Sequence, residues 1–276
     1  MSFPLSTPDD LAAQIPDGSL LGIPRDHSGV SMELVRALIR AGKRDLRLFG
    51  LTSAGISFDL LVGAGCVAEV ETPGVSLGEF GPARNFGRAV KEGTVRIKDA
   101  TCPAMHAQLQ AAEKGVPFMP LRGIIGSDLL KFRDDWLVMD NPYGENDPIV
   151  LLPAVQPDYA LFHASLVDDE GNIWIGKRME LKTLAHAANH TFVTAERRYE
   201  GNLLETDEYA AGTIPSLYLS GVALAERGTW PCGFWDGAKA DGEHMRLYAN
   251  ACKTTKGFRA YVDEYVFGKK PAVAAE

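Results

Sequence analysis

The fold is decided by residues 19–51, which read SLLGIPRDHSGVSMELVRALIRAGKRDLRLFGL. The apolar run at its start is typical of a buried strand, and a loop over 24–30 follows it. From about Ser31 the apolar residues recur every three or four positions, as on one face of a helix, and Gly42 is a stop signal. A second apolar run at 46–51 completes a strand–helix–strand unit. Because parallel strands need a crossover such as a helix, this stretch predicts a parallel sheet with helices packed on it.

The same alternation continues along the chain. It predicts strands at 67–70, 95–97, 159–165 and 191–195, a hairpin strand at 173–175 after a turn at 168–172, and helices at 58–62, 82–92, 103–114, 180–189 and 243–253. The run at 159–165 is continuous enough to predict a strand buried on both faces. We therefore expect the α/β class, with an open, mostly parallel twisted sheet flanked by helices. No linker or repeat divides the chain, which predicts a single domain at 1–268 and a flexible tail at 269–276.

Composition excludes several classes of function. The chain has 276 residues and a formal net charge of −8, and its short basic pairs do not form the clustered basic surface that nucleic acids need. No apolar stretch approaches the roughly 20 residues of a membrane span, and the first residues lack the pattern of a secretion signal. The four cysteines are widely spaced, without a CxxC pair, which favours free thiols. We expect a cytoplasmic protein that binds small molecules or other proteins.

Two pairs of side chains have the four-residue spacing that places them on one face of a helix. They are His186 with His190 and Cys102 with His106. A zinc protease motif would need a glutamate between the histidines, and neither pair has a third ligand nearby, so we expect no metal site. His163 lies inside an apolar strand, where a hydrogen-bonded core histidine is favoured over an acid–base catalyst.

Two loop segments have interpretations that the residues alone leave open. Residues 229–237 hold three aromatic side chains around Cys232, and they form either the wall of a ligand cavity or a subunit interface. Residues 116–128 contain two prolines, then Arg122 and two glycines, which suit close approach to a carboxylate or phosphate. An ordinary loop with Arg122 in a surface ion pair fits the same residues. No Walker, dinucleotide-binding or nucleophile-elbow motif is present.

Five stretches carry a resemblance that covers most of the chain. They read LLVGAGCV at 60–67, GPARNFGRAV at 81–90, LQAAEKGVPFMPLRGIIGSD at 109–128, HASLVDDEGN at 163–172 and FRAYVDEYVFG at 258–268. In this order they resemble the alpha subunit of class I coenzyme A transferases of the glutaconate CoA-transferase type. The order along the chain makes the resemblance more specific than any one motif.

The resemblance implies how such a protein would work. The alpha chain pairs with a similarly folded beta-type subunit, in an expected α2β2 complex, and shapes the acyl pocket at their interface. In the beta chain, a glutamate attacks the acyl-CoA thioester and is acylated, and CoA then passes to a second carboxylate. Coenzyme A is thus a substrate, and no permanently bound cofactor is expected. The implied ligands are acyl-CoA and a carboxylic acid.

The matching motifs place the candidate substrate-binding residues mostly in loops that follow strands, the edge where open α/β sheets bind ligands. These candidates are Ser28, Gly29, Ser76, Glu79, Phe80, Asn85, Phe86, Cys102, Arg122, Gly126 and Ser127. Glu79 begins a pattern that departs from the beta-type nucleophile motif, because Arg84 stands in place of its second glycine. We therefore assign no catalytic residue to this chain and interpret Glu79 as a support of the pocket or a cap of the next helix.

Departures from the family pattern keep alternatives open. The loop at 23–30 has fewer glycines than the family version, which predicts a different acyl group. A related branch, the CoA-thioester hydrolases that open a steroid-derived ring, shares this scaffold and has an acidic residue near the position of Cys102. Because Cys102 is no carboxylate, transfer is favoured over hydrolysis. A non-catalytic sensor or assembly subunit is the third alternative, since a fold does not determine a function.

Overall fold

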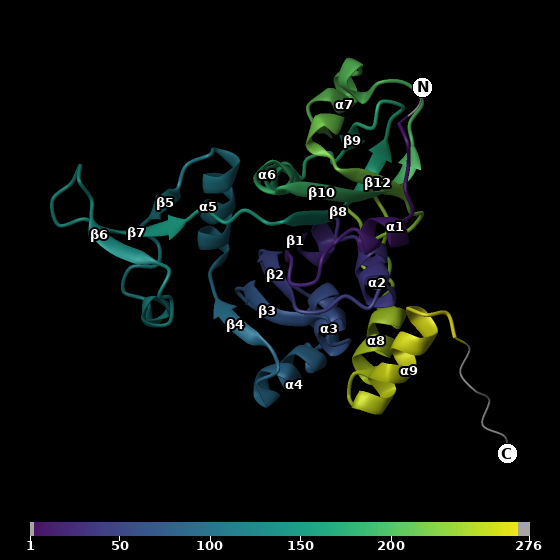
Figure 1. Cartoon of the computed structure of the whole chain (residues 1–276), viewed down its shortest axis with the longest axis horizontal. Helices are drawn as coiled ribbons and strands as arrows, with labels where there is room; N and C mark the ends of the chain where they lie inside the picture. The colour runs from purple at the N-terminus through teal and green to yellow at the C-terminus, as the bar shows by residue number, and fades with distance from the viewer. Residues whose placement is uncertain (1–2, 270–276) are drawn as a thin grey trace.

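A central sheet of nine strands forms the body of the protein in the computed structural model, which describes residues 3–269 (Figure 1). Seven strands follow the order β11-β9-β8-β1-β2-β3-β4, while β10 pairs with β8 and β12 with β10. The pairs β8–β9 and β9–β11 are antiparallel and the others are parallel. The strands span Leu20–Pro24 (β1), Leu46–Leu51 (β2), Val67–Thr72 (β3), Arg96–Asp99 (β4), Tyr159–Val167 (β8), Ile173–Trp174 (β9), His190–Arg198 (β10), Thr213–Ile214 (β11) and Gly221–Leu224 (β12). The predicted open, mostly parallel α/β fold is confirmed.

Helices cover both faces of the sheet, because side chains of successive strand residues point to opposite faces. In β2, Leu48 packs into a core cluster with helices α1, α2, α3, α8 and α9, whereas Phe49 packs into a second cluster with α5 and α6. The helices span Pro8–Ala13 (α1), Met32–Arg40 (α2), Ile56–Gly63 (α3), Arg84–Glu92 (α4), Cys102–Glu113 (α5), Met179–Ala187 (α6), Asp207–Ala210 (α7), Gly242–Ala251 (α8) and Thr255–Tyr265 (α9).

The predicted start of the first long helix is confirmed at Ser31. This residue is the N-cap of α2, and its hydroxyl accepts a hydrogen bond from the backbone N–H of Leu34 at 3.2 Å. Thr101 caps α5 in the same way through the N–H of Ala104. The predicted hairpin is also present, since β9 returns antiparallel to the end of β8. Helix α4 begins at Arg84, two residues later than predicted.

Residues 117–153 form a structure that we did not predict. They hold β5 (Phe118–Leu121), β6 (Leu137–Asp140) and β7 (Pro148–Pro153), an antiparallel sheet in the order β5-β7-β6. We call residues 117–153 the arm, because they extend beyond α5 and away from the central sheet (Figure 1). Its strands β5 and β6 read FMPL and LVMD, which are nearly continuous apolar runs without the alternation of apolar and polar residues by which half-buried strands are recognised, and β5 also contains a proline.

The C-terminal part forms a helical hairpin. Sequence periodicity predicted one helix near 243–253, whereas the structure has both α8 and α9, packed against one another. The tail predicted at 269–276 lies, apart from Lys269, outside the described residues, and the single-domain organisation stays a prediction. Within residues 3–269, no helix has both the length and the apolar character required to cross a bilayer.

Candidate functional site

A cavity of about 350 Å³ lies where β1, β2 and β3 end. The loops that follow these strands form three of its walls, and residues before and within α8 form the fourth. Because the carboxyl ends of parallel strands meet at one edge of a sheet, this is the usual ligand edge of an open α/β fold. Its lining consists of Arg25, Asp26, His27, Ser53, Ala54, Gly55, Gly74, Val75, Ser76, Leu77, Gly78, Phe80, Cys232, Ala240 and Met245.

Asp26 joins the first two loops of the cavity. Its carboxylate accepts a hydrogen bond from the backbone N–H of Ile56, at the start of α3, with an N–O distance of 3.0 Å. Burial raises the pKa of Asp26 above its ordinary value, and this hydrogen bond only partly offsets the effect. Asp26 is therefore held in place by the protein, and it is the one carboxylate among the cavity-lining residues that the structure describes.

The two neighbours of Asp26 are less constrained than Asp26 itself. Arg25 and His27 are exposed at the cavity, and neither forms an ion pair or a side-chain hydrogen bond within residues 3–269. A guanidinium group is always charged and presents paired N–H donors that match a carboxylate or phosphate. Arg25 is thus available to an anionic part of a ligand in the cavity.

Gly55 leaves the space that Asp26 occupies, since a Cβ atom at this position would overlap Oδ2 of Asp26. We expect Gly55→Ala to displace the carboxylate and to lower the free energy of unfolding by about 1–3 kcal/mol, the usual effect of overpacking. The matched control is Gly74→Ala, because Gly74 lines the same cavity but a Cβ there meets no atom within 4 Å. Chemical denaturation checks this, and equal stabilities of the two variants would contradict it.

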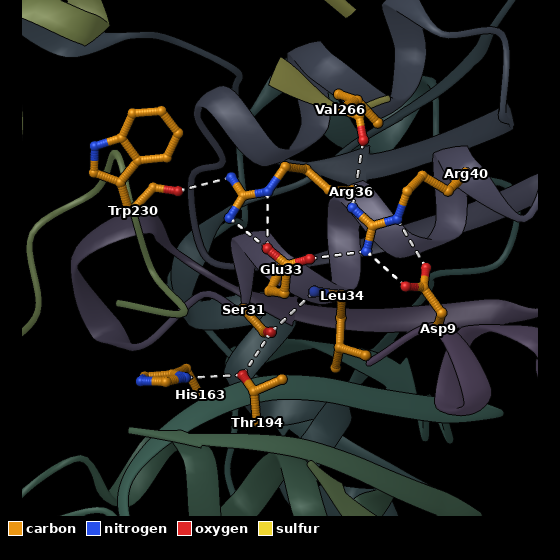
Figure 2. A network of polar contacts seen from close by, with 10 residues as sticks. All are labelled: Asp9, Ser31, Glu33, Leu34, Arg36, Arg40, His163, Thr194, Trp230 and Val266. Carbon is orange, nitrogen blue, oxygen red and sulfur yellow. Dashed lines mark hydrogen bonds and ion pairs between the residues drawn. The ribbon is translucent and has the colours of Figure 1, made fainter. Parts of the chain in front are cut away.

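A buried polar network joins the start of α2 to strands β8 and β10 (Figure 2). The Ser31 hydroxyl lies 2.7 Å from that of Thr194, which in turn lies 2.8 Å from Nδ1 of His163. Nε2 of His163 contacts the Glu196 carboxylate at 3.0 Å. Burial lowers the pKa of His163, and the hydrogen bond to Glu196 and the charge of that carboxylate oppose the shift. His163 is fully buried, which confirms the prediction of a hydrogen-bonded core histidine.

This network holds two cavity loops in position. The backbone N–H of His163 donates to the carbonyl of Gly29, directly after the first loop, at 2.7 Å. On the other side Arg36 of α2 pairs with Glu33 and donates to the carbonyl of Trp230, two residues before the cavity-lining Cys232 (Figure 2). Of residues 229–237, Cys232 lines the cavity, whereas the aromatic side chains of Trp230, Phe234 and Trp235 are not among the lining residues. A subunit interface stays a prediction for these three.

The predicted site residues from the first and third loops are in the two segments that supply lining residues after β1 and β3. Ser76 and Phe80 line it, and Glu79 is exposed between the lining residues Gly78 and Phe80. Ser28 and Gly29 directly follow the lining residue His27 and are buried, and neither lines the cavity. The proposed capping role of Glu79 is wrong, because α4 has no side-chain cap.

Asn85 and Phe86 belong to a different buried network. The Asn85 amide donates to Asp59 of α3 at 2.9 Å, and Asp59 also accepts from the Tyr248 hydroxyl and from the N–H of Phe86. These contacts join α3, α4 and α8, whose ends lie near the cavity, and neither Asn85 nor Phe86 lines it. Direct contact with substrate stays a prediction for both.

The remaining predicted residues lie away from the cavity lining. Cys102 is exposed at the first position of α5, and Gly126 and Ser127 belong to the arm. Arg122, also in the arm, donates from Nε to Asp147 at 2.7 Å and so forms a surface ion pair, one of the two roles that its sequence allowed. A ligand role for these four residues stays a prediction, and it would require another subunit to complete a binding site around them.

The structure corrects one of the spacing arguments for metal ligands. His190 is in β10, because α6 ends at Ala187, so His186 and His190 do not share a helix face. His186 instead stacks on Tyr218 and faces Glu113. Within residues 3–269, no group of three or more His, Cys, Asp or Glu side chains is arranged to hold a metal ion.

Sequence reasoning missed the cavity contributions of Arg25, Asp26, the 53–55 loop and Met245. The position of a loop directly after a predicted strand was a usable signal for the first two, because it marks the ligand edge. Met245 had no such signal, since it reaches the cavity from a helix close to the other end of the chain.

Comparison with known proteins finds similarity over most of the chain. A family model described as coenzyme A transferase matches residues 5–222. The A-type subunit of glutaconate CoA-transferase from Acidaminococcus fermentans is 27% identical over 84% of this chain and 78% of that protein. The cholesterol ring-cleaving hydrolase IpdA subunit of Rhodococcus jostii is 29% identical over 95% of this chain and 91% of its own length.

Two further matches concern length and fold. An uncharacterised protein of Archaeoglobus fulgidus is 32% identical over 88% of this chain, but the match spans only 54% of that protein, so this chain corresponds to about half of it. The crystal structure of glutaconate coenzyme A-transferase from Acidaminococcus fermentans superposes with a TM-score of 0.89 at 24% identity, covering 96% of this chain and 89% of that one. This superposition supports the fold alone.

Proposed function

Because the chain belongs to the coenzyme A transferase family, we propose that it is the alpha-type subunit of a heteromeric CoA-transferase. In this proposal it moves CoA from an acyl-CoA to a carboxylic acid, in a cytoplasmic α2β2 complex with a beta-type chain. The similarity to a protein that is named as one subunit of its enzyme supports the division into two chains. The four cysteines are free thiols, in keeping with a reducing compartment.

The observation that carries the proposal is the cavity with no free carboxylate of its own. Covalent CoA transfer needs an ionised carboxylate as nucleophile. Asp26 is the lining carboxylate of the described chain, and its Oδ2 already accepts a hydrogen bond from the backbone N–H of Ile56, which stabilises the oxygen and makes it less reactive toward a thioester. Glu79 is not among the lining residues. A carboxylate from a partner therefore completes the site.

The proposed reaction proceeds by successive exchanges at one glutamate of the beta-type chain. Its carboxylate oxygen attacks the thioester carbonyl and CoA thiolate leaves, which gives an acyl-glutamyl anhydride. The thiolate then attacks the glutamyl carbonyl and releases the first carboxylic acid. The acceptor carboxylate repeats both steps in reverse and takes CoA. N–H donors must stabilise the negative oxygen in each step, and this chain contributes the wall that orients the acyl group.

Arg25 narrows the class of acyl group that we propose. It is a cation at the cavity without an ion-pair partner in residues 3–269, beside apolar residues such as Val75 and Met245. The relative from Acidaminococcus fermentans is named for glutaconate, a dicarboxylate. We propose that the acyl group ends in a second carboxylate, which pairs with Arg25 while the thioester end faces the partner.

Hydrolysis with ring opening is the second candidate function. It is favoured by the larger share of both chains that the match to the ring-cleaving hydrolase covers. The match to the Rhodococcus IpdA protein covers more of this chain, and more of that protein, than the match to the glutaconate enzyme does. The residue near the position of that branch's acidic group is Cys102, which is exposed at the start of α5 and is not part of the cavity lining. This absence of a carboxylate keeps transfer as the favoured function.

Co-expression with the beta-type chain tests the proposal. We expect ping-pong kinetics with an acyl-CoA and a free carboxylic acid, and borohydride reduction of a trapped glutamyl-CoA thioester on the beta chain, read by mass spectrometry. The isolated chain serves as control and is expected to be inactive. Full activity of the isolated chain would exclude the proposal, and release of free CoA without need for an acceptor would favour the hydrolase.

A further inference from the structure

The arm presents apolar side chains to solvent on both faces. All four residues of β6 are exposed, and because side chains alternate along a strand, Leu137 and Met139 point to one face and Val138 to the other. The exposed fraction reaches 79% for Phe132 and 96% for Tyr143. Those two aromatic side chains alone leave on the order of 300 Å² uncovered. Together with the exposed β6 residues they give the arm an apolar exposed area of the size that marks interaction sites on proteins.

The base of the arm is fixed to the body of the protein. Arg133, whose side chain is 2% exposed, pairs with Glu71 of β3 at 2.8 Å and with Asp135 at the same distance. Its guanidinium carbon also lies 4.0 Å from the ring centre of Trp136. Trp136 and Val150 are buried in the core cluster that contains α5. The arm is therefore a preformed element with a packed base and an uncovered outer part.

Charge on the arm indicates which surface would cover it. Arg122 and Lys131 are paired with Asp147 and Asp128, and Arg133 is paired as described above. Asp134, Asp140 and Glu145 have no ion-pair partner within residues 3–269. The uncompensated charge of the arm is thus acidic, which opposes contact between two identical arms and suits an apolar cleft with basic residues at its rim.

From these observations we infer that the arm inserts into an apolar cleft of the beta-type chain and is covered there on both faces. This rests on the proposed function, which supplies the beta-type partner. The uncovered apolar side chains and the acidic charge of the arm are the features that this partner surface would complement. The arm also has a small pocket of about 180 Å³, which could bind one side chain of the partner. It is lined by Pro120, Arg122, Asn141 and others.

Binding of the purified beta-type chain to arm variants tests this inference. We expect Phe132→Asp and Leu137→Asp to weaken binding at least 30-fold, the effect of losing a central interface residue, which is about 2 kcal/mol. The matched control is Leu217→Asp, because Leu217 is 86% exposed but lies outside the arm, and its binding is expected to match wild type. Melting temperatures of the isolated variants are expected to stay unchanged, because both arm residues face solvent.

A photo-crosslinking benzoylphenylalanine at position 143 identifies the neighbour without changing the fold of the arm. A crosslink to the beta-type chain supports the inference, whereas a crosslink to a second copy of this chain overturns it. Wild-type binding by the Phe132 and Leu137 variants, or equal loss in the Leu217 control, also overturns it and leaves the proposed function intact. If the wild-type chain does not bind the beta-type chain, the proposed function fails together with the inference.

Discussion

Replacing Arg25 by alanine is expected to lower kcat/KM for acyl-CoAs that end in a second carboxylate by about 10- to 100-fold. A hydrogen bond between charged groups contributes about 1.5–3 kcal/mol, and Arg25 is the cation at the cavity without an ion-pair partner among the described residues. An acyl-CoA of the same length without that carboxylate is expected to lose less than threefold, because it never formed the ion pair. The measurement is kcat/KM for both substrates with the assembled enzyme.

Two further variants separate charge recognition from a general defect. Arg25→Lys is expected to recover part of the loss, since lysine keeps the charge but not the paired donors. Arg259→Ala removes an exposed arginine of α9 that lies outside the cavity lining, and it is expected to behave as wild type. Equal losses for both substrates in Arg25→Ala would contradict the proposed dicarboxylate and would leave CoA transfer itself unaffected.

The central sheet could be predicted because its signals are local. Residues 19–51 carry two apolar runs, a cap at Ser31 and a stop at Gly42, and each of these features depends on neighbours within a few positions. The edge at which ligands bind follows from parallel strands alone. Loops after the strands were therefore candidates in advance, and Ser76 and Phe80 do line the cavity.

The other parts of the site depend on contacts that sequence patterns do not report. Asn85 is hydrogen-bonded to Asp59 and Tyr248, and Tyr248 lies 163 positions away in the chain. A polar residue in a motif therefore resembles a ligand contact even where it braces helices. The arm was not predicted, because its apolar residues are exposed in this chain. Only contact with a partner would bury one face of its strands.

Replacing Arg133 by alanine is expected to lower the free energy of unfolding by about 3 kcal/mol. Its side chain is 2% exposed and that of Glu71 is 6% exposed, and removal of one member of a buried ion pair leaves the other charge without compensation. Lys98 lies 3.3 Å from Glu71 and retains part of the pairing, which holds the loss near the lower end of the usual range. Urea denaturation of the isolated chain measures the effect.

The pH dependence of stability separates this ion-pair network from simple loss of packing. Burial alone would raise the pKa of Asp135, but hydrogen bonds from Arg133 and Lys98 outweigh it and lower the pKa to about 2. Because this folded-state pKa lies below the unfolded value of about 3.9, the carboxylate stabilises the fold above pH 4, and that stabilisation is lost as the pH falls from 4 to 2. Arg133→Ala is expected to flatten this dependence of stability on pH.

The double variant Arg133→Ala, Glu71→Gln is expected to be more stable than Arg133→Ala alone, because it leaves no uncompensated buried charge. An additive loss in the double variant would show that Arg133 acts through its stacking on Trp136 and not through Glu71.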